Sequence, residues 1–145
     1  MAWSMMAYPC LLAAQRLSST TMGTALFGGW VLAAWDIFLD PQMVGQGYWS
    51  WANTGWQLPG VPGIPMQNFL GWLLAAMVLM ALLDRLPRKV ASDAVPTTML
   101  TWVWVSSIVA NLLFLARPGV AVWGGVCMGL IVVPFLWRTW SQPRW

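Results

Sequence analysis

Two carboxylates lie inside one of the most apolar stretches of the chain. Asp36 and Asp40 belong to the run GGWVLAAWDIFLDPQM (residues 28–43) and make up half of the four acidic residues in the sequence. Side chains four residues apart share a helical face, with Cβ atoms about 5 to 6 Å apart. Burial and a neighbouring like charge disfavour ionising both groups, so we expect one of them to keep its proton near neutral pH. Such a pair combines a proton donor with a proton acceptor, as general acid and base catalysis requires.

Other side chains that could line a site are found nearby in the sequence. Asn68 begins the next apolar run, where we interpret it as a helix N-cap, and Trp72 follows one turn later on its face. Trp35 is adjacent to Asp36 and therefore points about 100° around the helix from it. A simpler interpretation stays open here, in which Asp36 bonds to a neighbouring helix and Asp40 lies in the wet interface.

The elements that must position these groups are membrane helices. Of the 145 residues, 59% are hydrophobic and only 8% are charged, which lies far outside ordinary soluble composition. A spanning helix needs about 20 mainly apolar residues. We therefore predict an all-α, polytopic transmembrane helix bundle with a short N-terminal apolar helix in residues 1–14. The four predicted spans are residues 22–39, 68–83, 98–116 and 119–137.

Local signals predict how these elements end. Pro41 removes a backbone donor and disfavours helical geometry at Asp40, so we expect the first span to end or bend there. Residues 1–14 are too short to cross, and we interpret them as the tail end of a helix or as an interfacial segment. Asp84, beside Arg85 and Arg88, is interpreted as a solvated helix end.

Basic residues predict the orientation of the bundle, because short cytoplasmic loops are enriched in Lys and Arg. Alternation of the spans places Arg117 alone on one side and predicts a cytoplasmic C-terminus on the other. The six remaining basic residues all fall on that cytoplasmic side: Arg16, Arg85, Arg88, Lys89, Arg138 and Arg144.

The segment from Pro41 to Gln67 then lies on the outer face. Its Gly and Pro content argues against regular structure. Two interpretations of its aromatic residues stay open, namely a belt at the headgroup boundary and a cover over a lipid-soluble substrate. The aromatic residues concerned are Tyr48, Trp49, Trp51 and Trp56.

Missing residue types limit the chemistry further. The sequence has no His, and its two cysteines, Cys10 and Cys127, are far apart within apolar runs. Imidazole metal sites are therefore excluded, and the cysteines are interpreted as small packing residues. We expect no metal, no cofactor and no nucleic-acid partner. Membrane lipid is expected to surround the predicted bundle.

Three runs resemble the integral membrane carotenoid biosynthesis proteins, a family that includes γ-carotene hydroxylase-like carotenoid hydratases. They are AAWDIFLDPQM (33–43), GYWSW (47–51) and GIPMQNFLGW (63–72). The match is dense over residues 28–72 and mainly hydropathic beyond. The resemblance implies an enzyme of isoprenoid metabolism in a bacterial or archaeal cell membrane. Residues 1–145 are expected to form one integral membrane domain. Relatives are longer at the N-terminus, so three interpretations stay open: an N-terminally truncated product, a shortened homologue, or one piece of a split protein.

The resemblance implies addition of water across the terminal carbon–carbon double bond of an acyclic carotenoid, which gives a tertiary alcohol. Protonating such an alkene creates a tertiary carbocation, so the site needs a carboxylic acid, an apolar tunnel and electron-rich rings. We assign Asp36 as the acid and Asp40 as the group that orients water, although the two roles are interchangeable at this point. Trp35, Asn68 and Trp72 are the expected substrate-binding residues.

Competing functions come from other classes of protein. Intramembrane acids are common on ion pathways, so one alternative is a noncatalytic membrane module or transporter subunit whose Asp pair binds a cation or proton. A second is a carotenoid cyclase, which also uses acid chemistry on an alkene. The zero His count argues against oxygenation by non-haem iron. Four spans enclose little space for a long substrate, so a homo-oligomer or a partner subunit that supplies further helices is expected.

Overall fold

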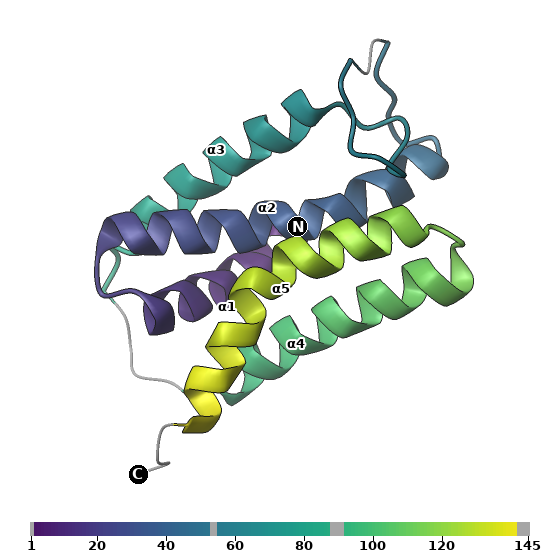
Figure 1. Cartoon of the computed structure of the whole chain (residues 1–145). Coiled ribbons are helices and arrows are strands. Elements are labelled where there is room, and N and C mark those ends of the chain that lie inside the picture. Colours follow the sequence, from purple (N-terminus) through teal and green to yellow (C-terminus); the bar gives the residue numbers. More distant parts are fainter. Residues whose placement is uncertain (1, 53–54, 88–91, 142–145) are drawn as a thin grey trace.

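Helices form all the regular structure in the part of the chain that the computed structural model describes, residues 2–52, 55–87 and 92–141. They lie roughly side by side in a bundle (Figure 1). A π-helical turn, η1, continues α4 directly and leads into the turn before α5. In chain order the elements are α1 (Ala2–Leu17), α2 (Thr21–Gly45), α3 (Met66–Leu83), α4 (Ala94–Val109), η1 (Ala110–Phe114) and α5 (Pro118–Ser141).

Four helical segments are long and apolar enough to cross a membrane, which confirms the predicted fold class. They are α2, α3, α4 together with η1, and α5. α2 differs from the prediction at its C-terminal end, because Pro41 lies inside the helix, which continues to Gly45. Arg117 Nη1 donates to the Pro41 carbonyl oxygen at 2.7 Å, so the turn that contains the proline is tied to the start of α5.

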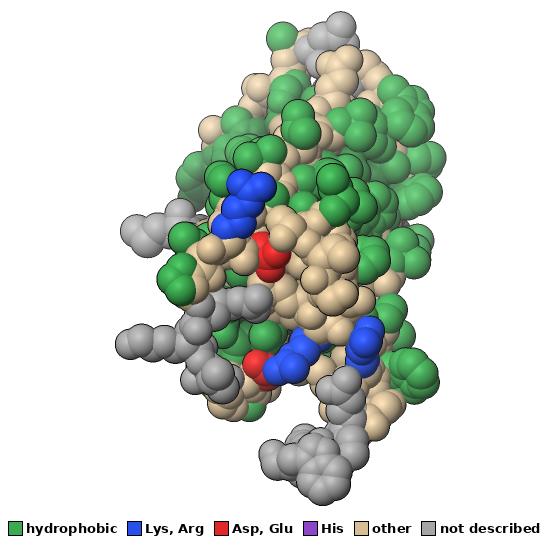
Figure 2. Space-filling view, turned by 90° about the vertical axis from the view of Figure 1, so that its left-hand side faces the viewer, with side chains coloured by type: hydrophobic (Ala, Val, Ile, Leu, Met, Phe, Trp, Pro, Cys, Tyr) green, Lys and Arg blue, Asp and Glu red, His purple; other side chains and the backbone are tan. Residues whose placement is uncertain are grey.

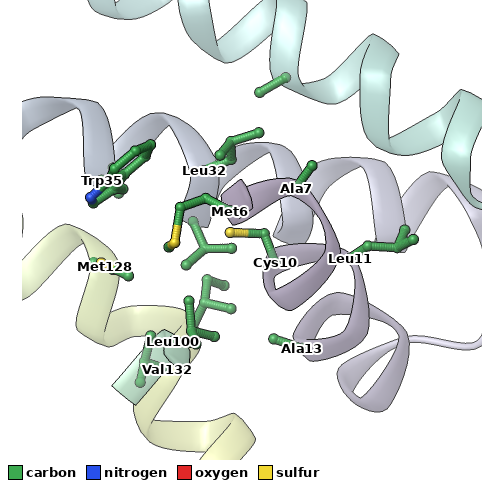
Figure 3. Packing of buried hydrophobic residues seen from close by; sticks show 14 of the residues in the cluster. Met6, Ala7, Cys10, Leu11, Ala13, Leu32, Trp35, Leu100, Met128 and Val132 are labelled. Atoms are coloured by element: carbon green, nitrogen blue, oxygen red, sulfur yellow. The ribbon is translucent and has the colours of Figure 1, made fainter. Parts of the chain in front are cut away.

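α1 packs inside the bundle. Met6 and Cys10 are fully buried, and they point toward Leu32 of α2, Leu100 of α4 and Val132 of α5 (Figure 3). Of the two interpretations for residues 1–14, the interfacial segment is therefore wrong. The physical reason is that one face of this short helix fills space between the long helices.

α2 lies at the centre of the bundle and packs against α1, α3 and α5. Small residues permit close approach on two sides. A Cβ atom at Gly29 would lie 2.5 Å from Met77 Cγ and 2.8 Å from the Met77 backbone nitrogen of α3, and one at Gly124 of α5 would lie 2.6 Å from Phe38 Cζ of α2. These contacts fix the spacing of α3 and α5 around α2.

Charged side chains gather at one end of the bundle, which we call the basic end (Figure 2). Arg16 and Asp93 form an ion pair there. Asp84 accepts hydrogen bonds from Gln15 Nε2 at 2.6 Å and from Thr21 Oγ1 at 2.9 Å. Asp84 lies at the C-terminal end of α3 and is half-buried, as a helix end in contact with solvent would be, and its carboxylate also joins this end to α1 and α2. Arg88, Lys89 and Arg144 lie outside the described residues.

The opposite end carries the segment of residues 46–65, between α2 and α3, and the turn between η1 and α5 (Figure 1). We call it the loop end. Arg117 lies in that turn, as the alternation of spans predicted. The prediction of irregular structure is confirmed for the described residues of the 46–65 segment, which form turns and bends. It is wrong for residues 41–45 and 66–67, which belong to α2 and α3.

Candidate active site

Asp36 and Asp40 lie on adjacent turns of α2 toward the loop end, and the structure buries both. Each has only 4% of its surface exposed. Both line the same pocket, as their four-residue spacing on a continuous helix requires. Because α2 continues past Pro41, Asp40 keeps helical geometry and the pair stays on one face.

The pocket is apolar apart from the two carboxyl groups. Small-molecule sites in proteins are usually concave, mainly apolar and supplied with a few convergent polar groups. The seven apolar residues that line it are Ile37 of α2, Leu58, Val61, Ile64 and Pro65 of the segment before α3, and Met66 and Phe69 of α3.

The 46–65 segment folds back over the carboxyl pair and is held against α5. Trp123 Nε1 donates to the Pro59 carbonyl oxygen at 2.9 Å. Gly60 and Gly119 meet so closely that a Cβ atom at Gly119 would lie 2.3 Å from the Gly60 carbonyl oxygen. Val61 is thereby buried as a pocket wall.

The same segment carries exposed aromatic side chains. Tyr48, Trp49 and Trp56 are all exposed in the bundle. The backbone at Trp56 contacts the start of α3, because the Trp56 carbonyl oxygen accepts a hydrogen bond from the Met66 backbone nitrogen at 2.9 Å. The exposed rings suit a headgroup boundary while other residues of the segment cover the pocket, so the two interpretations of this segment are compatible.

The two carboxyl groups have different partners. Asn68 Nδ2 donates to Asp40 Oδ2. The Asp40 carboxyl and the indole of Trp3 in α1 lie within hydrogen-bonding reach of the Asp36 carboxyl. Asp36 Oδ2 is buried and has no hydrogen-bond partner among the described residues. Leaving a buried polar atom without a partner costs free energy, so such an atom in a native structure calls for a functional explanation.

Asn68 is not the N-cap of α3, contrary to the interpretation from sequence. The helix begins at Met66 with Pro65 as its N-cap residue. The Asn68 backbone nitrogen bonds to the Pro65 carbonyl oxygen at 3.0 Å, as a residue inside the first turn does. Its side chain is therefore free to reach across to α2 and Asp40.

The two expected tryptophans lie outside the pocket lining. Trp35 is buried in the hydrophobic core beside Met6 and Met128 (Figure 3), because adjacent helix positions diverge by about 100°. Trp72 is 41% exposed, and its ring packs on Trp3 with the centroids 4.7 Å apart. Trp72 thus contacts the ring that reaches Asp36.

Sequence reasoning missed two residues of this site. Phe69 lines the pocket, and its position next to Asn68 in the run GIPMQNFLGW was the available signal. Trp3 reaches Asp36 from a helix far away in the sequence, and no local pattern pairs those two positions. Among the described residues, no three His, Cys, Asp or Glu side chains come together as a metal site would need.

These features define a class: an all-helical membrane protein that holds a carboxyl pair under a folded-back segment in an apolar pocket. Within that class, the chain belongs to the carotenoid biosynthesis protein family, whose model matches residues 1–136. A relative, bisanhydrobacterioruberin hydratase of Haloarcula japonica, is 35% identical over 74 residues, which are 51% of this chain and 23% of the relative. The chain thus spans about a quarter of that relative's length. No solved structure matches the chain.

Proposed function

We propose that this protein is a carotenoid hydratase that adds water across the terminal double bond of an acyclic carotenoid end group without a cofactor. The observation that carries the proposal is the buried Asp36 and Asp40 pair in a pocket whose other lining is apolar. The family match and the hydratase relative support the choice of substrate and reaction. An isoprenoid end is apolar, so the apolar lining beside the carboxyl groups suits it chemically.

The partners of the two carboxyl groups favour one assignment of roles. A hydrogen-bond donor stabilises a carboxylate; Asn68 donates to Asp40, and the Trp3 indole reaches Asp36. Asp36 still keeps one oxygen, Oδ2, that has no hydrogen-bond donor among the described residues, so we place the shared proton on that oxygen. Asp36 Oδ2 has no competing acceptor among the described residues. That suits an acid whose proton must go to carbon, because an alkene competes poorly with oxygen for a proton.

The reaction then balances within the pair. The Asp36 O–H bond breaks as its proton bonds to the less substituted alkene carbon, and the alkene π electrons form that C–H bond. A tertiary carbocation remains on the neighbouring carbon. A water molecule oriented by Asp40 forms the C–O bond and gives its proton to the Asp40 carboxylate. Because the two carboxyl groups lie within hydrogen-bonding reach, the proton returns to Asp36 and restores the starting state.

Expression of the protein in a cell that accumulates an acyclic carotenoid tests the proposal. We expect a pigment heavier by one water, and growth in ¹⁸O-labelled water should place the label in the new hydroxyl group. An isomer of unchanged mass would instead indicate cyclisation. Unchanged pigment, with the protein shown to be inserted in the membrane, would contradict an enzymatic role and favour the noncatalytic module.

We also propose that the protein lies in the cell membrane with its basic end and C-terminus in the cytoplasm. The basic end carries Arg16, Arg85 and Arg138, whereas Arg117 lies at the loop end, and the positive-inside rule relates this asymmetry to orientation. The site would then open near the outer surface of the membrane.

Reporter fusions measure this orientation. A fluorescent protein fused after the C-terminus is expected to fluoresce, and alkaline phosphatase at the same position to be inactive, because the phosphatase needs an oxidising compartment. The opposite pattern would reverse the proposed orientation and leave the chemistry of the site unaffected.

A further inference from the structure

The pocket contains one aromatic ring among its lining residues, and that ring belongs to Phe69. The ring lies in the first turns of α3, directly after Asn68, whose side chain holds Asp40. Phe69 therefore shares a cavity with both carboxyl groups and is carried by the same turn that positions one of them.

Contacts outside the pocket hold this ring in a defined orientation. The Phe69 ring meets the indole of Trp30 in α2 edge to face, with centroids 6.1 Å apart and an interplanar angle of 86°. Trp30 is itself fixed, because its Nε1 donates to the Cys127 carbonyl oxygen of α5 at 2.7 Å. Three helices thus set the position of one phenyl ring.

We propose that Phe69 is a further catalytic residue, whose ring stabilises the carbocation formed when the alkene is protonated. This inference rests on the proposed hydration. A cation within about 6 Å of an aromatic centroid is attracted to the ring, and the attraction is larger where water is excluded. The phenyl ring also carries no N–H or O–H group, so it cannot compete with water for the cation.

Fluorinated phenylalanines placed at position 69 test the ring's electrons without changing its shape. Fluorine withdraws density from the ring face, so we expect turnover at saturating substrate to fall stepwise from phenylalanine through monofluoro- to trifluorophenylalanine. The full loss should be about 2- to 30-fold, as a cation–π contribution of roughly 0.5 to 2 kcal/mol implies. The substrate concentration at half-maximal rate should stay nearly constant, because the neutral alkene is bound before the charge appears.

The matched control is the same series at Phe114, whose side chain is 80% exposed on η1 and should leave turnover unchanged. A conventional pair adds a second measurement: Phe69→Leu should lose activity, and Phe69→Trp, which keeps an electron-rich face, should retain more of it. Equal turnover across the fluorinated series at position 69 would overturn the role of Phe69 and leave hydration standing. Failure of the unsubstituted protein to hydrate would remove the proposed function and this inference with it.

Discussion

Asp36→Asn is expected to abolish hydration of an acyclic carotenoid while the protein remains folded and inserted in the membrane. The amide has nearly the shape of the carboxylic acid, but it cannot release a proton to carbon. General acid catalysis contributes about 10²- to 10⁴-fold to a rate, so conversion should fall by at least two orders of magnitude. Mass analysis of the extracted pigment, with the amount of membrane protein measured in parallel, gives the result.

Asp93→Asn is the matched control for this substitution. It makes the same chemical change at the basic end, where Asp93 pairs with Arg16 on the surface. Exposed ion pairs contribute only about 0 to 1 kcal/mol, so hydration should continue near the wild-type rate. If Asp36→Asn converted pigment as well as Asp93→Asn does, Asp36 would have no part in the mechanism.

Asp40→Asn separates the two carboxyl roles. If Asp40 orients and deprotonates water, loss of the Asp40 carboxylate should slow the capture of the carbocation by water more than it slows the formation of the carbocation. In deuterated water this variant should then exchange deuterium into the alkene end, because a cation that is not captured returns a proton to Asp36. Asp36→Asn should show neither hydration nor exchange. Exchange in Asp36→Asn alone would reverse the assignment.

The sequence predicted those parts of the fold and site that depend on local periodicity. Spans are readable because every lipid-crossing helix must be long and apolar. The shared face of Asp36 and Asp40 follows from their four-residue spacing alone. Both predictions needed no knowledge of which helices pack together.

The remaining features depend on contacts between distant segments. Val61 lies over the carboxyl pair because the backbones of Gly60 and Gly119 are in close contact, and no local periodicity in the sequence predicts that contact. Trp3 and Asp36 belong to different helices. Trp35 is expected among the substrate-binding residues although it points about 100° around the helix from Asp36, and that divergence places it in the hydrophobic core. Pro41 does not end the helix, because α2 continues through it to Gly45 and Arg117 binds its carbonyl oxygen.

Gly29→Ala is expected to destabilise the protein strongly through the packing of α2 on α3. The added Cβ would lie 2.5 Å from Met77 Cγ and also 2.8 Å and 2.9 Å from the Met77 backbone nitrogen and Cα. Backbone atoms cannot rotate away, so the helices must separate. Overpacking of this kind costs about 1 to 3 kcal/mol, against the roughly 1 kcal/mol that alanine gains over glycine in a helix, so the net loss is up to about 2 kcal/mol. The apparent Tm in detergent should fall accordingly.

Gly71→Ala in α3 is the matched control, since no atom lies within 4 Å of a Cβ placed there, and its Tm should be unchanged or slightly raised. The distinction reaches the active site. Asp40 lies eleven residues beyond Gly29 on α2, about 16 Å at 1.5 Å per residue. Its partner Asn68 lies on α3, which the Cβ added at position 29 would push away through Met77. Gly29→Ala should therefore lower the hydration rate by a larger factor than it lowers the amount of folded protein, because the Asn68 amide no longer reaches Asp40. Equal Tm and equal activity in the two variants would show that the contact at Gly29 does not set the distance between α2 and α3, on which the Asn68–Asp40 hydrogen bond depends.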